Sequence, residues 1–125
     1  MTDNENAADQ VVHVYYSILK GGMASFDEQR LREILAPELD FHGPIAGHRI
    51  GAEPFIKGVR GFAATMRGLT MLQQLCTEDA AAALYDAEMP GGTVRFAEFF
   101  QVKDDRIQSL TLLFDPAEYT ARGGR

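Results

Sequence analysis

VRFAEFFQVKDDRIQSLTLLFD, residues 94–115, contains two strand-like runs separated only by the pair Asp104-Asp105. A break this short between strands allows only an antiparallel hairpin. Two further runs precede it, at residues 69–77 and 81–89, again with short polar or Pro-Gly breaks between them. The second half of the chain therefore predicts a four-stranded antiparallel meander.

Glu98 is a carboxylate in the middle of an aromatic run, RFAEFF. Side chains alternate along a strand, so Phe96, Glu98 and Phe100 share one face. Both faces of residues 94–102 carry apolar side chains, which is typical of a strand covered on both sides. A buried carboxylate must be hydrogen-bonded, paired or neutralised. In an apolar pocket its pKa would rise; the alternatives are an ion pair with Arg95 or Arg106 and an edge position that faces water.

The first half of the chain predicts helices. Their apolar periodicity and stop signals place them at residues 7–20, 26–36 and 53–66. Asp3 or Asn6 is a possible cap for the first helix, and Pro37 prevents continuation of the second. A short strand, residues 39–42, and a glycine-containing loop with His48 and Arg49 connect the second helix to the third.

Composition limits the possible functions. The chain has 125 residues, 46% of them hydrophobic, a net charge of −6 and one cysteine. We expect one domain over residues 1–125, with a core at about 7–116 and a loose tail at 117–125. The acidic balance and scattered cations argue against nucleic-acid binding. No apolar run approaches the ~20 residues of a membrane span, and no Cys or His cluster has metal-ligand spacing. We expect a cytoplasmic protein without metal or cofactor.

Three stretches together resemble a known superfamily: YYSILKGG, LREILAPELDFHGPIAGHRIGAEPF and, above all, the hairpin quoted first. Over roughly residues 7–116, the chain is similar to nuclear transport factor 2-like proteins, which include ketosteroid isomerases and SnoaL-type polyketide cyclases. The resemblance implies an α+β fold. Three N-terminal helices would pack on a curved, mainly antiparallel sheet, as in cystatin-like proteins, and form a cone with an internal apolar pocket.

The resemblance also implies site roles. In ketosteroid isomerases a helix-1 tyrosine and a protonated acid on a late strand form an oxyanion hole, and an aspartate in the first strand moves the proton. Tyr15 and Glu98 match the first two roles, whereas Gly43 stands at the aspartate's position. His42 is the nearest replacement base, but it points away from the pocket if Phe41 and Gly43 face inward, unless the strand is bulged.

The predicted substrate-binding residues are mostly apolar. They are Tyr16, Phe41, Phe55, Phe62, Met66, Phe96, Phe100, Leu112, Phe114 and Asp115, with Leu72 as a further lining residue. Asp115 could instead cap the first turn of the tail, and Tyr15 is expected to lie deeper than Tyr16.

Three functions compete at this stage. The first is a cofactor-independent isomerase, cyclase or dehydratase that uses general acid/base chemistry on an apolar carbonyl-bearing small molecule. The second is a non-catalytic binder of an apolar metabolite, and the third a dimerisation or partner-binding module. The apolar character of both faces of residues 94–102 also predicts a homodimer through the sheet face.

Overall fold

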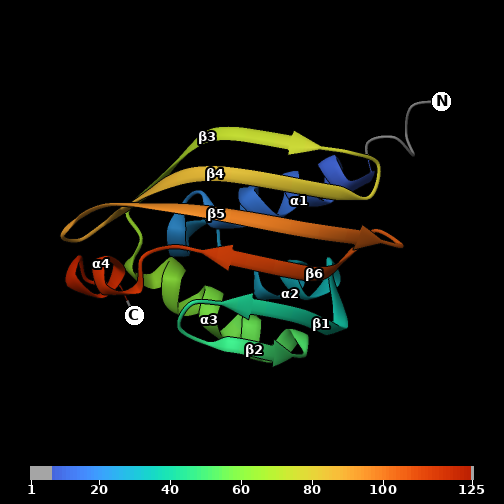
Figure 1. Cartoon of the computed structure of the whole chain (residues 1–125), viewed down its shortest axis with the longest axis horizontal. Helices are drawn as coiled ribbons and strands as arrows, with labels where there is room; N and C mark the ends of the chain where they lie inside the picture. The colour runs from blue at the N-terminus through green and yellow to red at the C-terminus, as the bar shows by residue number, and fades with distance from the viewer. Residues whose placement is uncertain (1–6, 125) are drawn as a thin grey trace.

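The computed structural model describes residues 7–124. Its elements run in the order α1 (Ala7–Leu19), η2 (Gly22–Ala24), α2 (Glu28–Glu33), β1 (Leu35–Gly43), β2 (Gly47–Ile50), α3 (Ala52–Thr65), β3 (Gly68–Cys76), β4 (Ala80–Met89), β5 (Gly92–Lys103), β6 (Arg106–Leu113) and α4 (Pro116–Ala121) (Figure 1). The α+β class and the four late strands are confirmed. The caps considered at Asp3 and Asn6 lie outside the described residues.

The strands of the described part form one open sheet in the order β2-β1-β6-β5-β4-β3. All neighbours are antiparallel except β1 and β6, so the sheet is mainly antiparallel, as predicted. The β5–β6 hairpin turns at Asp104 and Asp105, whose φ angles are 56° and 60°. Two successive left-handed residues are the signature of a type I′ turn, whose twist matches the flanking strands.

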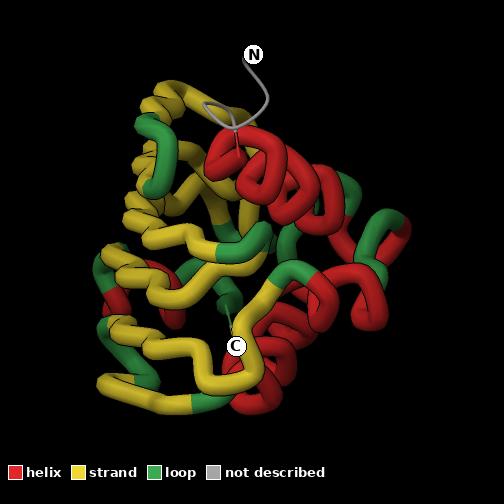
Figure 2. Tube along the Cα trace, turned by 90° about the vertical axis from the view of Figure 1, so that its right-hand side faces the viewer, coloured by secondary structure: helices red, strands yellow, loops and turns green. Residues whose placement is uncertain are grey.

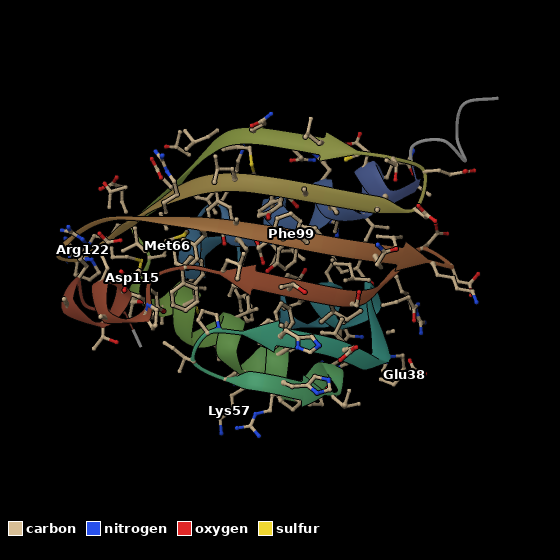
Figure 3. All side chains as sticks on the ribbon, in the orientation of Figure 1. Glu38, Lys57, Met66, Phe99, Asp115 and Arg122 are labelled. Carbon is tan, nitrogen blue, oxygen red and sulfur yellow. The ribbon has the colours of Figure 1, made fainter. Side chains whose placement is uncertain are left out.

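The two faces of β5 differ sharply in burial. Phe96, Glu98 and Phe100 are buried, whereas Phe99 is 48% exposed and projects from the opposite face of the sheet (Figure 3). The expectation that both faces are covered is therefore wrong for this chain. The alternation instead defines an inner face, which carries the core, and an outer face, which the helices leave open.

Helices α1, α2 and α3 lie on the inner face, as Figure 2 shows with the sheet seen from its edge. Helix α1 buries most of its surface, including Val12, Tyr15, Tyr16 and Leu19, and it packs against β4 and β5. Helix α3 covers β1 and the β2 edge.

The second helix is shorter than predicted. It ends at Glu33, and Leu35 already begins β1, so that Pro37 lies within a strand. The pairing of β1 with β6 is irregular between Leu35 and Asp40. This irregularity accommodates the proline, because proline has no N–H to donate to a sheet. Residues 47–50, predicted as loop, form the edge strand β2.

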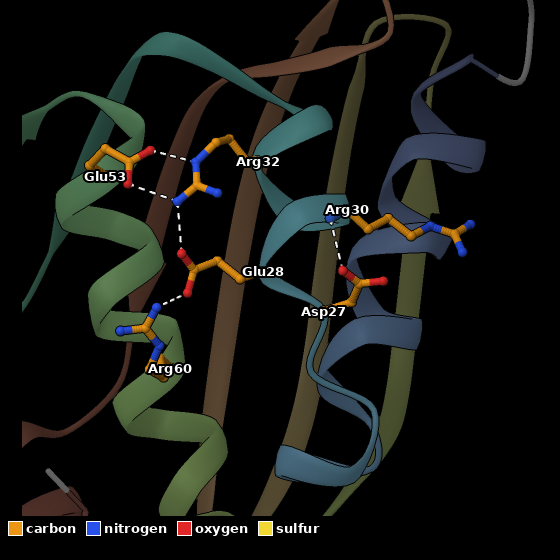
Figure 4. A network of polar contacts seen from close by, with 6 residues as sticks. All are labelled: Asp27, Glu28, Arg30, Arg32, Glu53 and Arg60. Atoms are coloured by element: carbon orange, nitrogen blue, oxygen red, sulfur yellow. Dashed lines mark hydrogen bonds and ion pairs between the residues drawn. The ribbon is translucent and has the colours of Figure 1, made fainter.

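Charged side chains connect α2 to α3. Arg32 bridges Glu28 and Glu53 at 2.9 and 2.7 Å, and Arg60 pairs with the other oxygen of Glu28 (Figure 4). Asp27 caps α2 by accepting a hydrogen bond from the backbone N–H of Arg30. These contacts hold the short α2 against the helix that forms one wall of the cavity described below.

The expected loose tail is wrong, because residues 116–121 form α4. Asp115 caps this helix by accepting hydrogen bonds from the backbone N–H groups of Ala117 and Glu118, and Pro116 occupies the first turn. Tyr119 is buried against Phe62, Phe96 and Phe114. This six-residue helix buries only one aromatic side chain, Tyr119, so its sequence shows no apolar periodicity from which a helix could be predicted.

Candidate functional site

A cavity of about 250 Å³ lies between the inner face of the sheet and helices α1, α3 and α4. Apolar side chains dominate its wall, and the polar or charged residues that line it are Tyr15, Arg49, Tyr85, Glu98 and Tyr119. An apolar cavity with a few polar groups is the usual form of a small-molecule site, although this one falls below the ~300–1,000 Å³ of drug-sized pockets.

Glu98 accepts hydrogen bonds from two neighbouring tyrosines of α1. The Tyr15 hydroxyl donates to its Oε2 at 3.0 Å, and the Tyr16 hydroxyl donates to its Oε1 at 2.5 Å. Glu98 is only 1% exposed, and Tyr85 of β4 adds a third hydrogen-bonding interaction. Consecutive residues of a helix both reach the carboxyl group because α1 is buried on most of its circumference.

Burial has the largest effect on the pKa of Glu98. It raises the pKa of Glu98 from its usual value near 4.5 to about 7, against the opposing effect of hydrogen bonds from Tyr16, Tyr15 and Tyr85. Burial and the nearby Glu98 charge raise the pKa values of Tyr15 and Tyr85 well above normal. The phenols therefore stay neutral donors, and Glu98 exchanges its proton near neutral pH.

Tyr16 tunes Glu98 without lining the cavity. Replacing Tyr16 with phenylalanine should raise the pKa of Glu98 above about 7. The charged carboxylate would lose a hydrogen bond worth ~1.5–3 kcal/mol to an ionised acceptor. A carboxyl-carbon NMR titration measures the shift. Tyr15→Phe should raise the pKa by a smaller amount, so an unchanged pKa in Tyr16→Phe would contradict the assignment.

The structure brings most predicted site residues together. The predicted residues that line the cavity are Tyr15, Phe41, Phe55, Phe62, Phe96, Glu98, Leu112 and Phe114. Six predicted residues are elsewhere, of which His42 is described in the next paragraph. Tyr16 and Phe100 are buried behind the lining, and Met66 is buried at the end of α3. Asp115 caps α4, and Leu72 is 44% exposed on β3.

His42 is not a replacement base. Phe41 and Gly43 line the cavity, so His42, between them on β1, projects from the outer face and is exposed. The bulge that could have turned it inward lies earlier in the strand, between Leu35 and Asp40. A Cβ at Gly43 would lie 2.7 Å from the Phe41 ring. That ring thus fills the space in which a side chain at position 43 would lie.

Among residues 7–124, Glu98 forms no ion pair with an arginine, so the alternative of an ion pair with Arg95 or Arg106 is wrong. Arg95 lies on the outer face, where its guanidinium donates to both carboxylate oxygens of Asp86 at 2.8 and 3.1 Å. Cross-strand pairing puts Asp86 directly opposite Arg95. Asp86 is therefore one half of a surface ion pair, and it does not form a carboxylate pair with Glu88, which accepts a hydrogen bond from Thr93.

Sequence reasoning missed several lining residues, of which Tyr85 and Arg49 matter most chemically. Tyr85 had a usable signal: in AAALYDAEM it alternates with Asp86 and so shares a face with Ala83 and Ala87. Arg49 was placed in a loop. In β2 it stands directly opposite Phe41, and cross-strand partners share a face, which brings Arg49 to the mouth of the cavity.

Helices over the inner face of a curved, open, mixed sheet give this chain the fold of nuclear transport factor 2-like proteins, and it belongs to that superfamily. Within this class the chain belongs to the SnoaL-like domain family, whose match covers residues 15–110. The match contains both tyrosines of α1 and Glu98. No curated protein sequence matches the chain significantly.

Solved structures support the fold. A protein from Kribbella flavida superposes with a TM-score of 0.81 at 24% identity, covering 94% of this chain and 93% of that one. A steroid delta-isomerase from Pseudomonas aeruginosa gives 0.72 at 19% identity, with 90% and 82% covered. A de novo designed protein with a curved β-sheet gives 0.75 at 14% identity, with 90% of each chain covered. An isomerase and a design share this fold, so function must be argued from the site.

Proposed function

We propose that the protein binds a compact, apolar, carbonyl-bearing molecule in this cavity and acts on it by general acid/base chemistry, as an isomerase, cyclase or dehydratase does. The observation that carries the proposal is the buried Glu98 carboxyl in the cavity wall, with tyrosine hydroxyls on both of its oxygens. With a pKa of about 7, this carboxyl can both accept and release a proton at neutral pH, as a general acid or base must.

One carboxyl would serve for both proton transfers. Ionised Glu98 accepts a proton from the carbon next to the ligand carbonyl, and its protonated form returns that proton to another carbon. Each carboxylate oxygen has two lone pairs, so the tyrosine hydrogen bonds leave room for the incoming proton. Once Glu98 is protonated, the Tyr15 hydroxyl is free to donate to the developing oxyanion.

Cavity size supports a small ligand. A volume of about 250 Å³ equals that of roughly eight liquid waters at ~30 Å³ each. Phe55 and Phe96 line the cavity with aromatic side chains, and the Phe41 ring closes the side next to Gly43. We therefore favour ligands smaller than a steroid.

The test compares wild type with Glu98→Gln on a panel of small cyclic and unsaturated ketones. Wild type should exchange or shift protons next to the carbonyl, with a rate that depends on pH near 7. The glutamine variant should bind the same ketone but lose turnover by at least ~100-fold, the usual contribution of a general acid or base. Equal turnover by both proteins would refute the catalytic role.

Binding without turnover in wild type would favour the second candidate function, a carrier of an apolar metabolite.

The homodimer through the sheet face also remains a prediction. Phe99 and Leu113 are 48% and 53% exposed on the outer face, where a partner subunit would cover them. No helix among residues 7–124 is long and apolar enough to span a membrane.

A further inference from the structure

Three potential metal ligands meet on the outer face of the β1–β2 hairpin. His42 of β1 pairs directly with His48 of β2, and Asp40 lies two residues before His42 on the same face. The two imidazole rings stack with centroids 4.2 Å apart and planes 4° from parallel. Nε2 of His48 lies 2.5 Å from Asp40 Oδ1, and Nε2 of His42 lies 3.5 Å from the same oxygen.

One of these distances already suits a small borderline cation, and the other, the 2.5 Å hydrogen bond between His48 and Asp40, would lengthen when an ion is bound. Ligand atoms ~2.0–2.1 Å from a tetrahedral zinc ion are roughly 3.4 Å apart. The 3.5 Å separation of His42 Nε2 from Asp40 Oδ1 already matches that edge. The potential ligand atoms of all three residues lie within 4.8 Å of one another. Because the three side chains are about half exposed, they can rotate to point their lone pairs at one ion.

The ligand chemistry narrows the class of ion. Two imidazoles and one carboxylate favour Zn²⁺, Ni²⁺ or Cu²⁺ over Mg²⁺ and Ca²⁺, which prefer oxygen ligands. With three protein ligands, a tetrahedral ion keeps one position for water or another ligand. Without a metal, the same residues form a hydrogen bond between Asp40 and His48, with the His42 ring stacked on it.

The hairpin that carries these ligands also forms the mouth of the cavity. Residues 43–46 of its turn line the cavity, as do Phe41 and Arg49 on its inner face. His42 and His48 flank the turn on its two strands. One ion bound to both histidines would therefore tie the two strands together directly below the turn. We propose that Asp40, His42 and His48 form a binding site for a divalent transition-metal ion of the Zn²⁺ class, which clamps the cavity mouth.

Calorimetric titration of untagged protein with Zn²⁺ tests the site. The experiment uses a Cys76→Ser background, because the exposed Cys76 thiol could bind zinc itself. The parent should bind one ion per chain. His42→Ala and His48→Ala should each weaken binding at least ~10-fold, and Asp40→Asn should weaken it in the same direction. Far-UV circular dichroism should show that the variants, changed only at exposed side chains, remain folded.

His13→Ala is the matched control, because His13 is the third histidine of the chain and is exposed on α1. It should bind zinc like the parent, and excess Mg²⁺ should not compete. Hydrogen exchange should slow at residues 43–47 when Zn²⁺ is added to the parent and not when it is added to His48→Ala. Unchanged zinc affinity in His42→Ala and His48→Ala, or an equal loss in His13→Ala, would overturn the site. Binding without slower exchange would overturn the clamp.

Discussion

Glu98→Gln should abolish a pH dependence of stability that wild type shows between about pH 4.5 and 7. Folding raises the pKa of Glu98 from its usual value near 4.5 to about 7, so the folded state binds more protons than the unfolded state in this window. The free energy of unfolding must then fall as the pH rises. A shift of this size corresponds to about 3 kcal/mol, present in full below pH 4.5 and lost above pH 7.

Urea unfolding at half-unit pH steps gives the free energy of unfolding of wild type and of Glu98→Gln, and the effect is the difference between the two free energies. Glutamine keeps the size of the side chain, and the tyrosine oxygens can accept hydrogen bonds from its amide. The free energy of unfolding of wild type minus that of the variant should fall by about 3 kcal/mol between pH 4.5 and 7 and stay constant above pH 7. Glu38→Gln, at an exposed position on β1, is the control for exchanging a glutamate for glutamine. If the difference between wild type and Glu98→Gln did not change with pH, the pKa of Glu98 would be the same in the folded and unfolded states, and the proposed shift would be refuted.

The strand period was sufficient to predict the position of Glu98. The β5–β6 hairpin has a two-residue break, and its register leaves one face for Phe96, Glu98 and Phe100. The alternation of side chains along a strand depends only on the local sequence, so it can be predicted without knowledge of the rest of the fold. Which face is covered depends on the helices. That is why the exposure of Phe99 could not be read from an apolar run.

Errors in the site came from contacts between distant segments. The prediction that Tyr15 lies deeper than Tyr16 is confirmed, because Tyr15 is slightly the more buried of the two and lines the cavity. A helical wheel ranks residues by direction alone, so it could not show that the Tyr16 hydroxyl reaches the acid as well. Arg49 and His48 were assigned to a loop because four exposed residues of an edge strand carry no apolar alternation.

Gly58→Leu should block the cavity while making the protein more stable. Gly58 lines the cavity from the middle of α3, and a Cβ built there meets no atom within 4 Å. Leucine is a better helix former than glycine by ~0.5–1 kcal/mol, so the midpoint of urea unfolding should rise. Its side chain would occupy part of a volume of only about 250 Å³, so the affinity for a cavity ligand should fall at least ~10-fold.

A substitution that raises stability and lowers ligand affinity shows that the cavity is a ligand site, because a substitution that only damages the fold lowers both the stability and the affinity. Gly58→Ala should gain similar stability and retain most of the affinity, since one methyl group fills little of the cavity. Lys57→Leu places the same leucine one residue away, at an exposed position outside the cavity, and should change neither quantity. If Gly58→Leu bound the ketone as tightly as wild type, the ligand would lie elsewhere. The outer face of the sheet would then become the better candidate for function.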